Sequence, residues 1–540
     1  MAGADAGPPA PDAAVVDESE ALFQPDHILE VNITLAAADW EVLRNQPDAI
    51  GTGKTTCGNQ PLERAYDYFP GEITVDGTTV SNVGVRKKGG FGSITNGRPG
   101  LKIKAHEYTP GQRISGLKRL TLNNNHQDPT LISQCLGYGL FRGAGLAAPR
   151  CSFAHVTVNG EDLGVYSNVE SIKKNFLRRH FSDDSGNLYE SGGDFTPGGA
   201  SGFQPKVNKE APDCSDLDPV VTAMQSSDAD LRANLGAVIN LDKFMTYWSM
   251  EVLTDHWDGY ANNRNNYFFY HDPASDQFQF IPWGIDALFS GRARTTRPAS
   301  VFACGSMAWR LYDVPETRAM YIAKLRELID TVWDESAILA EITRMETLLL
   351  PLADPQSTGE YTARLQSVRN FVNTRGSVLL AELDASTPVW PYAQGDASCL
   401  IDIGTMTATF DTTWDTLENY AVGSGTTSGT ISGVSIDSTT VPTGAGLNEE
   451  GKVVVRLLGD LGGGIYAVAY IIYQDSVNFV PGTMDLDLVN VAAIMSFYDA
   501  NTDTSYGGGL MLGGSVTLTS AGMGVDAPVT GSFTGTVREF

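Results

Sequence analysis

Residues 254 to 289 read TDHWDGYANNRNNYFFYHDPASDQFQFIPWGIDALF, and this stretch determines the architecture that we expect around it. Residues 266–271 and 277–282 are rich in aromatic residues, which favours two strands. The five residues between them are Asp-Pro-Ala-Ser-Asp, a composition typical of a turn. We therefore predict a β-hairpin at the centre of this stretch.

The hairpin brings polar residues together at its open end. Antiparallel pairing places the chain before residue 266 alongside the chain after residue 282. The residues that we expect to gather there are Asp258, Asn262, Asn263, Asn266 and Asp286. Carboxylate and amide oxygens suit a hard cation such as Mg2+. They also suit phosphoryl transfer, in which one Asp orients the attacking hydroxyl while an Asn and a second Asp hold metal ions on the phosphates.

The same residues have a structural interpretation. Asp and Asn are common in turns and helix caps. Aromatic residues are usually core, and the stretch contains Trp257, Tyr260, Tyr267, Phe269 and Trp283. The residue types alone leave both interpretations open.

Outward from the hairpin, the N-terminal side is rich in strands. Residues 27–35 alternate apolar and polar side chains, and Asp76-Gly77 is a hairpin turn signal. The strands that we expect are 27–35, 71–75, 83–87, 101–104, 152–158 and 164–169. The helices that we expect there are 37–44, 133–142 and 172–180.

The C-terminal side of the hairpin is helical as far as residue 383. We expect helices at 361–383 and over one long segment, 316–350, with another at 241–253 before the hairpin. Strands followed by helices predict an α+β domain.

After Pro391 the composition changes to Thr, Ser, Gly and Val. We expect strands at 453–458, 465–473, 489–496 and 516–520, which favours an all-β sandwich or jelly roll. The predicted division is a flexible Ala/Pro/Asp-rich linker at 1–25, an α+β domain at 26–388 and an acidic β domain at 389–540. The β domain is expected to bind a cell surface or carbohydrate.

The formal net charge of −27 argues against nucleic acid as a partner, because phosphates repel so acidic a chain. No apolar run reaches the ~18 residues that a membrane span requires. The six cysteines include no CxxC pair, which argues against a zinc site, and they allow up to three disulfides in an exported protein. Buried thiols would explain Cys135 and Cys151 equally well.

Basic residues nevertheless crowd between positions 86 and 119, where they form either a solvated face or an anion site.

Two glycine-containing segments nearby are weak evidence for a phosphate-binding loop. Residues 51–55 resemble part of a phosphate-binding P-loop, but Asp48 occupies the position of its first glycine. Residues 89–93 could cover phosphates with backbone N–H groups, and a plain loop fits them as well.

Several blocks together resemble the CotH (spore coat protein H) kinase family. The hairpin stretch WDGY…NNYFFYHD…FQFIPWGID is similar to the family signature, and further blocks follow the family order over residues 26–383. These blocks are VRKKG at 85–89 with LKIK at 101–104, LTLNN at 120–124 with Asp128, LFR at 140–142, and VNG…GVY…E at 158–170. The resemblance implies an atypical protein-kinase-like fold.

The resemblance also implies a role for each residue. Asp258 would be the catalytic Asp, and Asp286 would bind the metal together with Asn266 or its competitor Asn263. Lys102 or Lys104 would contact the phosphates of ATP. Further expected contacts to the nucleotide are Arg86, Lys88 and Glu170, of which Glu170 would orient the lysine.

The expected function is therefore an ATP- and Mg2+- or Mn2+-dependent phosphotransferase that acts on Ser or Thr hydroxyls of exported or surface proteins. Such an enzyme would work outside the cell or at its surface. The alternative is a non-catalytic surface adhesin or coat-assembly protein of the same family. Retention of both Asp258 and Asp286 favours catalysis, because a degenerate member would have lost one of them.

Overall fold

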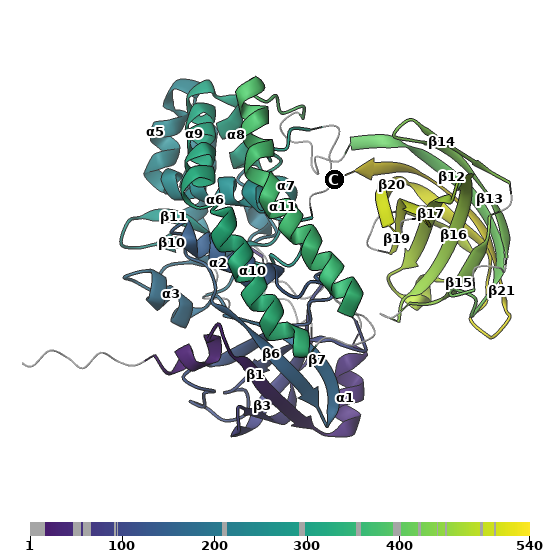
Figure 1. Cartoon of the computed structure of the whole chain (residues 1–540), viewed down its shortest axis with the longest axis horizontal. Coiled ribbons are helices and arrows are strands. Elements are labelled where there is room, and N and C mark those ends of the chain that lie inside the picture. The colour runs from purple at the N-terminus through teal and green to yellow at the C-terminus, as the bar shows by residue number, and fades with distance from the viewer. Residues whose placement is uncertain are drawn as a thin grey trace, which may run out of the picture.

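The computed structural model describes residues 17–46, 56–57, 66–90, 93, 95–207, 213–290, 297–352, 358–392, 401–419, 423–439, 441–448, 451–486, 490–501 and 504–539. Residues 51–55, where the sequence argued against a P-loop, and residues 1–16 of the predicted N-terminal linker lie outside these residues. Figure 1 shows a strand-rich part at the bottom, helices above it and a separate sheet to the right. The predicted α+β class with an all-β part after it is confirmed.

The strand-rich part is a closed barrel in the order β1-β2-β3-β4-β5-β7-β6. Its strands are β1 (Ile28–Leu35), β2 (Phe69–Val75), β3 (Thr78–Lys88), β4 (Gly100–Lys104), β5 (Arg119–Asn123), β6 (Cys151–Val158) and β7 (Glu161–Val169). Along β1 every second side chain is buried, as the predicted alternation requires. These apolar side chains fill the barrel, so the polar residues between them face outward.

Helices form most of the remainder of the first 385 residues. The α-helices are α1 (Ala37–Arg44), α2 (Ser133–Gly143), α3 (Lys174–His180), α4 (Asp218–Met224), α5 (Asp228–Val238), α6 (Leu241–Leu253), α7 (Tyr260–Asn263), α8 (Ser306–Asp313), α9 (Pro315–Thr331), α10 (Glu335–Leu349) and α11 (Thr358–Ala385). The short 3-10 helices before residue 400 are η1 (Glu18–Phe23), η2 (Gly199–Gly202), η3 (Ser215–Leu217) and η4 (Leu350–Leu352).

The predicted helical segment at 316–350 is two helices, not one. The helix α9 ends at Thr331, and Asp334 begins the next helix by accepting a hydrogen bond from the backbone N–H of Ala337 (3.0 Å). Since an Asp N-cap favours a new helix start, the break has a local cause.

A small sheet joins the barrel side to the helices. Its order is β11-β10-β8-β9, with β8 (Leu188–Glu190), β9 (Gln204–Pro205), β10 (Tyr267–Asp272) and β11 (Gln277–Pro282). The strands β10 and β11 pair antiparallel with Tyr267 opposite Pro282, so the predicted hairpin is confirmed. Its buried aromatic side chains pack against α6, as Phe280 does against Phe244.

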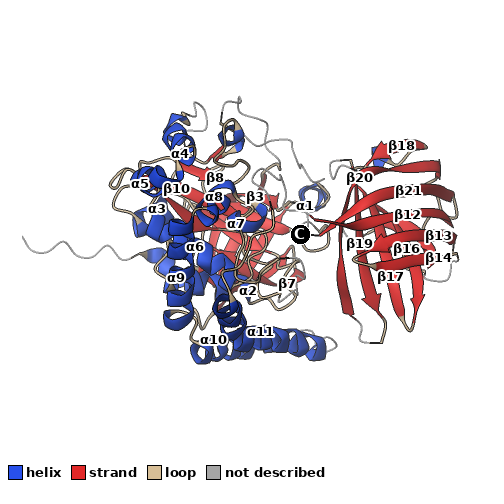
Figure 2. Cartoon of the chain, turned by 90° about the horizontal axis from the view of Figure 1, so that it is seen from above, coloured by secondary structure: helices blue, strands red, loops and turns tan. Residues whose placement is uncertain are grey.

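The last part of the chain is one ten-stranded sheet (Figure 2). Its elements are β12 (Ile401–Thr413), β13 (Ser424–Ile431), β14 (Val434–Ser438), β15 (Thr443–Leu447), β16 (Val453–Gly462), β17 (Ile465–Tyr473), η5 (Ser476–Asn478), β18 (Gly482–Asp485), β19 (Val491–Asp499), β20 (Thr504–Ala521) and β21 (Pro528–Glu539). The order is β14-β13-β12-β21-β20-β19-β17-β16-β15, and β18 pairs with β20.

This sheet corrects the expected sandwich. It curls over its own core like a half-barrel, so that Ser438 of β14 donates to the carbonyl of Asp460 in β16 (2.7 Å). The strands thus enclose one apolar cluster without forming two separate sheets. This cluster contains only residues between 406 and 537. The exact domain boundaries at 25/26 and 388/389 stay predictions.

Disulfides link distant parts of the first 385 residues. Cys57 pairs with Cys214, and Cys135 pairs with Cys151, so these last two are not the free thiols that the sequence also allowed. Cys304 is disulfide-bonded as well. Among the described helices, none combines the length and apolarity needed to span a bilayer.

Candidate active site

The hairpin delivers two loops to one place. Beyond its last pair, the backbone N–H of Trp283 donates to the carbonyl of Asn266 (3.3 Å). Gly284 lies against the Asn266 side chain so closely that a Cβ there would be 2.4 Å from Oδ1. The segment that leads to Asp286 therefore packs on the segment that follows Asp258, as the sequence predicted.

Asp258 lies between α6 and α7 and accepts hydrogen bonds from three side-chain amides. Asn263 and Asn265 donate to Oδ1 at 2.5 and 3.2 Å, and Asn266 donates to Oδ2 at 2.5 Å. Burial raises the pKa of the Asp258 carboxyl, while these amides oppose the rise because they stabilise the anion. The loop thus holds one half-buried carboxylate in a fixed orientation.

Glu251 of α6 holds the backbone of this loop in place through hydrogen bonds. Its fully buried carboxyl accepts from the Tyr247 hydroxyl (2.7 Å) and from the backbone N–H groups of Tyr260 and Ala261 (both 2.8 Å). Burial raises the pKa of Glu251 to about 8. Gly259 leaves room for the contact, since a Cβ there would be 2.1 Å from Glu251 Oε1. Sequence reasoning missed Glu251, and an acid within the otherwise uncharged run 244–253 was the available signal.

Asp286 lies close to both a cation and other acids. Burial raises the pKa of its carboxyl; Lys88 opposes the rise, and the charges of Asp258 and Asp128 add to it. Gly284, two residues before Asp286, packs on Asn266, whose amide binds Asp258, so Asp258 and Asp286 lie at the same end of the hairpin, with Lys88 close enough to act on Asp286. Asp128 itself accepts from the backbone N–H of Ser133 (2.7 Å) at the start of α2, which makes it a structural cap.

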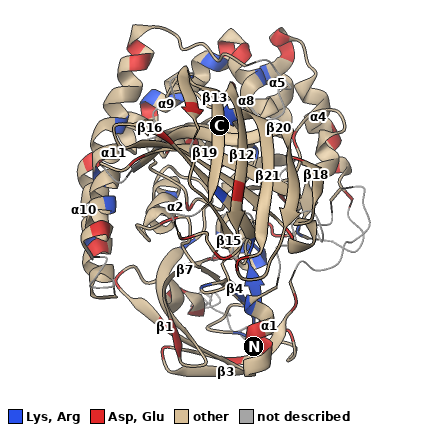
Figure 3. Cartoon of the chain, turned by 90° about the vertical axis from the view of Figure 1, so that its right-hand side faces the viewer, with Lys and Arg blue, Asp and Glu red and all other residues tan. Residues whose placement is uncertain are grey.

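The outer face of β3 and β4 supplies the cations. Arg86 lies opposite Lys102 in the ladder, and Lys88 two residues further donates to the side-chain oxygen of Asn123. Burial together with the charges of Arg86 and Arg119 lowers the pKa of Lys102 to about 7. Among the described residues Lys102 makes no ion pair. Figure 3 shows Lys and Arg gathered at β4.

Two predicted residues are engaged elsewhere. Lys104 forms an ion pair with Glu107, on the same strand face but further from the hairpin end. Glu170 is buried and binds Arg150 (2.9 Å) and Arg179. The prediction that Glu170 orients a lysine of β4 is therefore wrong: its carboxylate ties the end of β7 to β6 and α3.

Glu190 is the carboxylate that faces the lysines. Glu190 ends β8 and pairs with Phe268 of the hairpin. Burial lowers the pKa of both Lys88 and Lys102, and the negative charge of Glu190 opposes that lowering. Glu190 also forms an ion pair with Lys206. No sequence rule identified it, because the contact depends on how β8 pairs with a strand almost eighty residues later.

Asn262 does not join the cluster. Its amide donates to the carbonyl of Trp257 (2.6 Å), and its oxygen accepts from Arg297 (2.6 Å). The predicted convergence thus holds for Asn263 and Asn266, which touch Asp258, and is wrong for Asn262. His256 before the loop is fully buried, and burial lowers its pKa to about 3, so it stays neutral.

The donor set fits a magnesium–nucleotide complex. Mg2+ usually takes one or two protein carboxylates and completes its shell with phosphate and water oxygens. In the described part of the chain no three His, Cys, Asp or Glu side chains lie close enough to hold a metal unaided. Two carboxylates, amide oxygens and the basic residues of β3 and β4 match that shared mode of binding.

Comparison with known proteins gives a consistent family. A family model described as CotH kinase protein matches residues 85–379, more than half of the 540 residues. The Bacillus subtilis inner spore coat protein H is 23% identical over 266 residues, which cover 46% of this chain and 72% of that protein. Invasin CotH3 of Rhizopus delemar is 27% identical over 188 residues, 31% of each chain.

A solved structure is also similar. The crystal structure of a Helicobacter pylori proinflammatory kinase, CtkA, aligns with a TM-score of 0.27 and 9% identity over 56% of this chain and 96% of that one. A score this low does not establish a common fold. The family assignment rests on the sequence match alone.

Proposed function

The chain belongs to the CotH kinase family, and we propose that it is an ATP- and divalent-metal-dependent phosphotransferase acting on Ser or Thr hydroxyls of exported or surface proteins. The proposal rests on one observation. The loop that leads to Asp286 packs on Asn266, whose amide binds Asp258, so the open end of the hairpin holds both aspartates, and Lys88 of β3 lies close enough to act on the carboxyl of Asp286.

Each residue has a role that follows from its surroundings. Asp258, oriented by three amides, would accept or orient the proton of the acceptor hydroxyl. Asp286 would bind the metal, with Asn266 or Asn263 as the second ligand. Lys88 and Lys102, with Arg86, would bind the phosphates.

Lys102 is the better candidate for the main phosphate contact. Lys104 already has Glu107 as a partner, whereas Lys102 lies among like charges that a polyanion would neutralise. Glu190 takes the orienting role first assigned to Glu170. When bound, the metal and ATP supply charge neutralisation and the transferable phosphoryl group.

The location is proposed from the relatives and from the disulfides. Relatives are named spore coat and invasin proteins, and disulfides persist in oxidising compartments. Hydroxyl-bearing proteins of such a coat or surface would be the acceptors.

The test is transfer of labelled γ-phosphate from ATP by the purified chain with Mg2+ or Mn2+. We expect Asp258→Asn to lower the rate by ~10²- to 10⁴-fold, the usual contribution of a positioned general base. Asp286→Ala should weaken metal–nucleotide binding as well. Asp330→Asn on the exposed side of α9 is the matched control, since it removes one carboxylate far from the loop. Equal labelling by wild type and Asp258→Asn would refute the proposal.

A second candidate is a surface adhesin without turnover, which the invasin relatives favour. It predicts no transfer by wild type under any metal, together with binding of a host or coat protein that Asp258→Asn leaves unchanged. The same set of variants therefore separates the two functions.

A further inference from the structure

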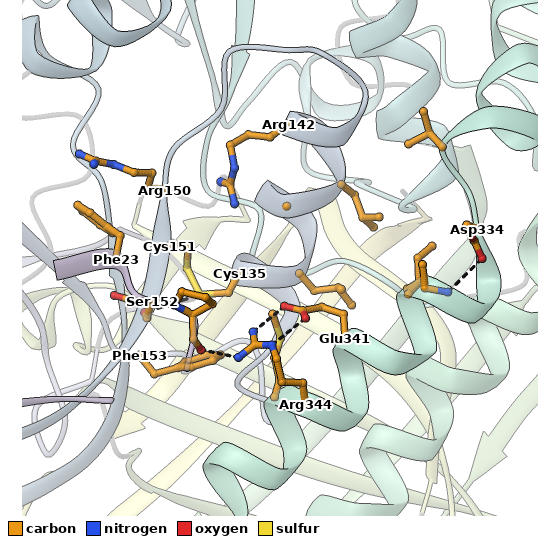
Figure 4. A pocket seen from close by; sticks show the side chains of 18 residues that line it. Phe23, Cys135, Arg142, Arg150, Cys151, Ser152, Phe153, Asp334, Glu341 and Arg344 are labelled. Atoms are coloured by element: carbon orange, nitrogen blue, oxygen red, sulfur yellow. Dashed lines mark hydrogen bonds and ion pairs between the residues drawn. A yellow bond between two sulfur atoms is a disulfide. The ribbon is translucent and has the colours of Figure 1, made fainter. Parts of the chain in front are cut away.

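A cavity of about 410 Å³ lies between the barrel and the helices, on the side of α2 that faces α10. Figure 4 shows its walls: α2 crosses one side, the end of η1 and the start of β6 form another, and α10 closes it. This volume is in the range of small-molecule sites in proteins.

Most of the cavity wall is apolar. Leu136 and Leu140 come from α2, Phe153 from β6, and Ile338 and Met345 from α10. The Cys135–Cys151 disulfide lies in the same wall and joins α2 to β6, which makes that wall rigid. A ligand that fills the cavity therefore needs an apolar body.

Three arginines line the cavity, and two are neutralised. Arg344 binds Glu341 through two nitrogens (2.8 and 2.6 Å). Arg150 binds the carboxylates of Asp17, Glu20 and Glu170.

Arg142 is different. Among the described residues it donates only to the carbonyl of Pro149 and has no ion pair, and Figure 4 shows its side chain directed between the disulfide and Arg150. Glu170 lies near enough for its charge to act on Arg142, but the ion pairs of Glu170 are with Arg150 and Arg179. A half-buried guanidinium without an ion pair of its own is well suited to bind an anionic group by charge-assisted hydrogen bonds.

The cavity is separate from the candidate active site because α2 stands between them. Residues 135, 136, 139 and 140 face the cavity. The other face packs on the loop of Asp286: a Cβ at Gly137 would be 2.3 Å from Leu288 and 2.8 Å from Ile285.

We propose that this cavity is a binding site for a small amphipathic organic anion, whose apolar body packs between α2 and α10 and whose charged group binds Arg142. The combination of one unpaired cation with apolar walls selects this class over neutral apolar molecules and over hydrophilic anions. This site is independent of the proposed phosphotransferase activity.

The test uses 1-anilinonaphthalene-8-sulfonate, a fluorescent probe with an apolar ring system and one sulfonate. We expect saturable binding to the folded full-length chain at one site. Dodecanoate should displace the probe, and the uncharged dodecan-1-ol should be at least about ten-fold less effective, because it lacks the anionic group.

Two variants test the location. Arg142→Gln should weaken probe binding by roughly ten- to hundred-fold, the range for losing a hydrogen bond to a charged group. Leu140→Trp should abolish binding by filling the apolar part while leaving Arg142 in place. Arg232→Gln is the matched loss of a cation, since Arg232 is exposed on α5 and pairs with Glu316 at the surface.

The outcomes are decisive in both directions. Loss of binding in Arg142→Gln or Leu140→Trp, with wild-type thermal unfolding and normal binding in Arg232→Gln, supports the proposal. If either variant misfolds, the other still tests the site. Wild-type affinity in both cavity variants, or no saturable binding by the wild type, would overturn it.

Discussion

At the scale of single residues, the site is a balance between burial and neighbouring charge. Burial raises the pKa of Asp286 and lowers that of Lys88, and each group partly restores the charge of the other. Neither change would occur in solvent, where both groups would be fully ionised at neutral pH. In the proposed complex, Asp286 would bind the metal and Lys88 would bind a phosphate group in place of each other.

This balance predicts a pH dependence of metal–nucleotide binding. In the proposed site the metal would require ionised Asp286, and the raised pKa means that the carboxylate is lost at a higher pH than for an exposed Asp. Affinity for Mg2+–ADP should therefore fall as pH decreases from about 8 to about 6, where an exposed Asp stays fully charged. Titration calorimetry at each pH measures this.

Asp286→Asn is the control for that prediction. It should bind the metal–nucleotide weakly and without the decrease at low pH, because the carboxyl group is gone. Any pH dependence that remains over this range should have the opposite sign, because Lys102, with a pKa of about 7, gains its charge as the pH falls. Equal pH slopes for wild type and Asp286→Asn would show that another group is responsible.

How far the sequence predicts single residues depends on how local their contacts are. Asp258 and Asp286 could be paired because one hairpin, readable from its turn and strands, connects them. Glu170 and Glu190 could not be told apart in this way. Their partners are chosen by β7 and β8 pairing with strands distant in sequence, which no local pattern encodes.

At the scale of elements, α6 carries the loop of Asp258. Its last turns place Glu251 under the two backbone N–H groups that begin α7. These groups are among the first N–H groups of a helix, which have no partner within it. The acid thus replaces an N-cap from a neighbouring helix and sets where the loop turns.

We predict that Gly259→Ala disturbs this arrangement. The added methyl group would be 2.1 Å from Glu251 Oε1 and 2.7 Å from His256, so one of them must move. Overpacking of this kind costs about 1–3 kcal/mol in the free energy of unfolding. Urea unfolding should show this loss, and phosphate transfer should fall with it.

Gly143→Ala is the matched substitution. Gly143 ends α2, and a Cβ there meets nothing within 4 Å. Because Ala favours a helix over Gly, this variant should be as stable as wild type or slightly more so. If the two variants were equally stable, Gly259 would not be required by packing.

Elements were predicted best where side-chain periodicity determines them. The strand β1 was predicted from the alternation of apolar and polar residues, and the helix α1 was predicted at the same bounds that the structure shows. The single helix expected at 316–350 failed because periodicity continues across a break that one N-cap introduces. The expected sandwich failed for another reason: whether ten strands form one sheet or two depends on pairing between distant segments, such as β12 with β21.

At the scale of the whole molecule, the disulfides differ most in the length of chain that they close. Cys57 and Cys214 are 157 residues apart, and Cys135 and Cys151 are 16 apart. A cross-link restricts the unfolded chain more when the loop is longer. The first disulfide should therefore matter more to stability, although the second lies nearer to the candidate site.

The prediction compares two double variants, Cys57→Ser/Cys214→Ser and Cys135→Ser/Cys151→Ser. The loop-entropy relation gives a loss of about 5 kcal/mol for the first and about 3 kcal/mol for the second. Urea unfolding monitored by far-UV circular dichroism measures both. A larger loss in the second variant would mean that rigid packing at α2, and not restriction of the unfolded chain, dominates.

The helix α2 is the element through which the cavity and the candidate site can be coupled. On the site face, Gln134 accepts from Asn123 (2.6 Å), and Asn123 accepts from Lys88. On the cavity face, the same turn carries Leu136 against the proposed ligand. Since close packing at Gly137 leaves α2 no free space toward Ile285, a shift on one face must be felt on the other.

Coupling through α2 predicts that the two ligands change each other's affinity, given both the proposed site and the proposed cavity. Saturating dodecanoate should change the affinity for Mg2+–ADP by about 5-fold or more, and Mg2+–ADP should change the affinity for dodecanoate by the same factor, because linkage is reciprocal.

Gln134→Leu should reduce this factor while preserving binding of each ligand alone, since it breaks the hydrogen bond to Asn123 but leaves the cavity wall. Two calorimetric titrations, each with and without the second ligand, measure it. Unequal factors would reveal an error in the binding model, and a factor of one would show that α2 holds the two sites rigidly apart.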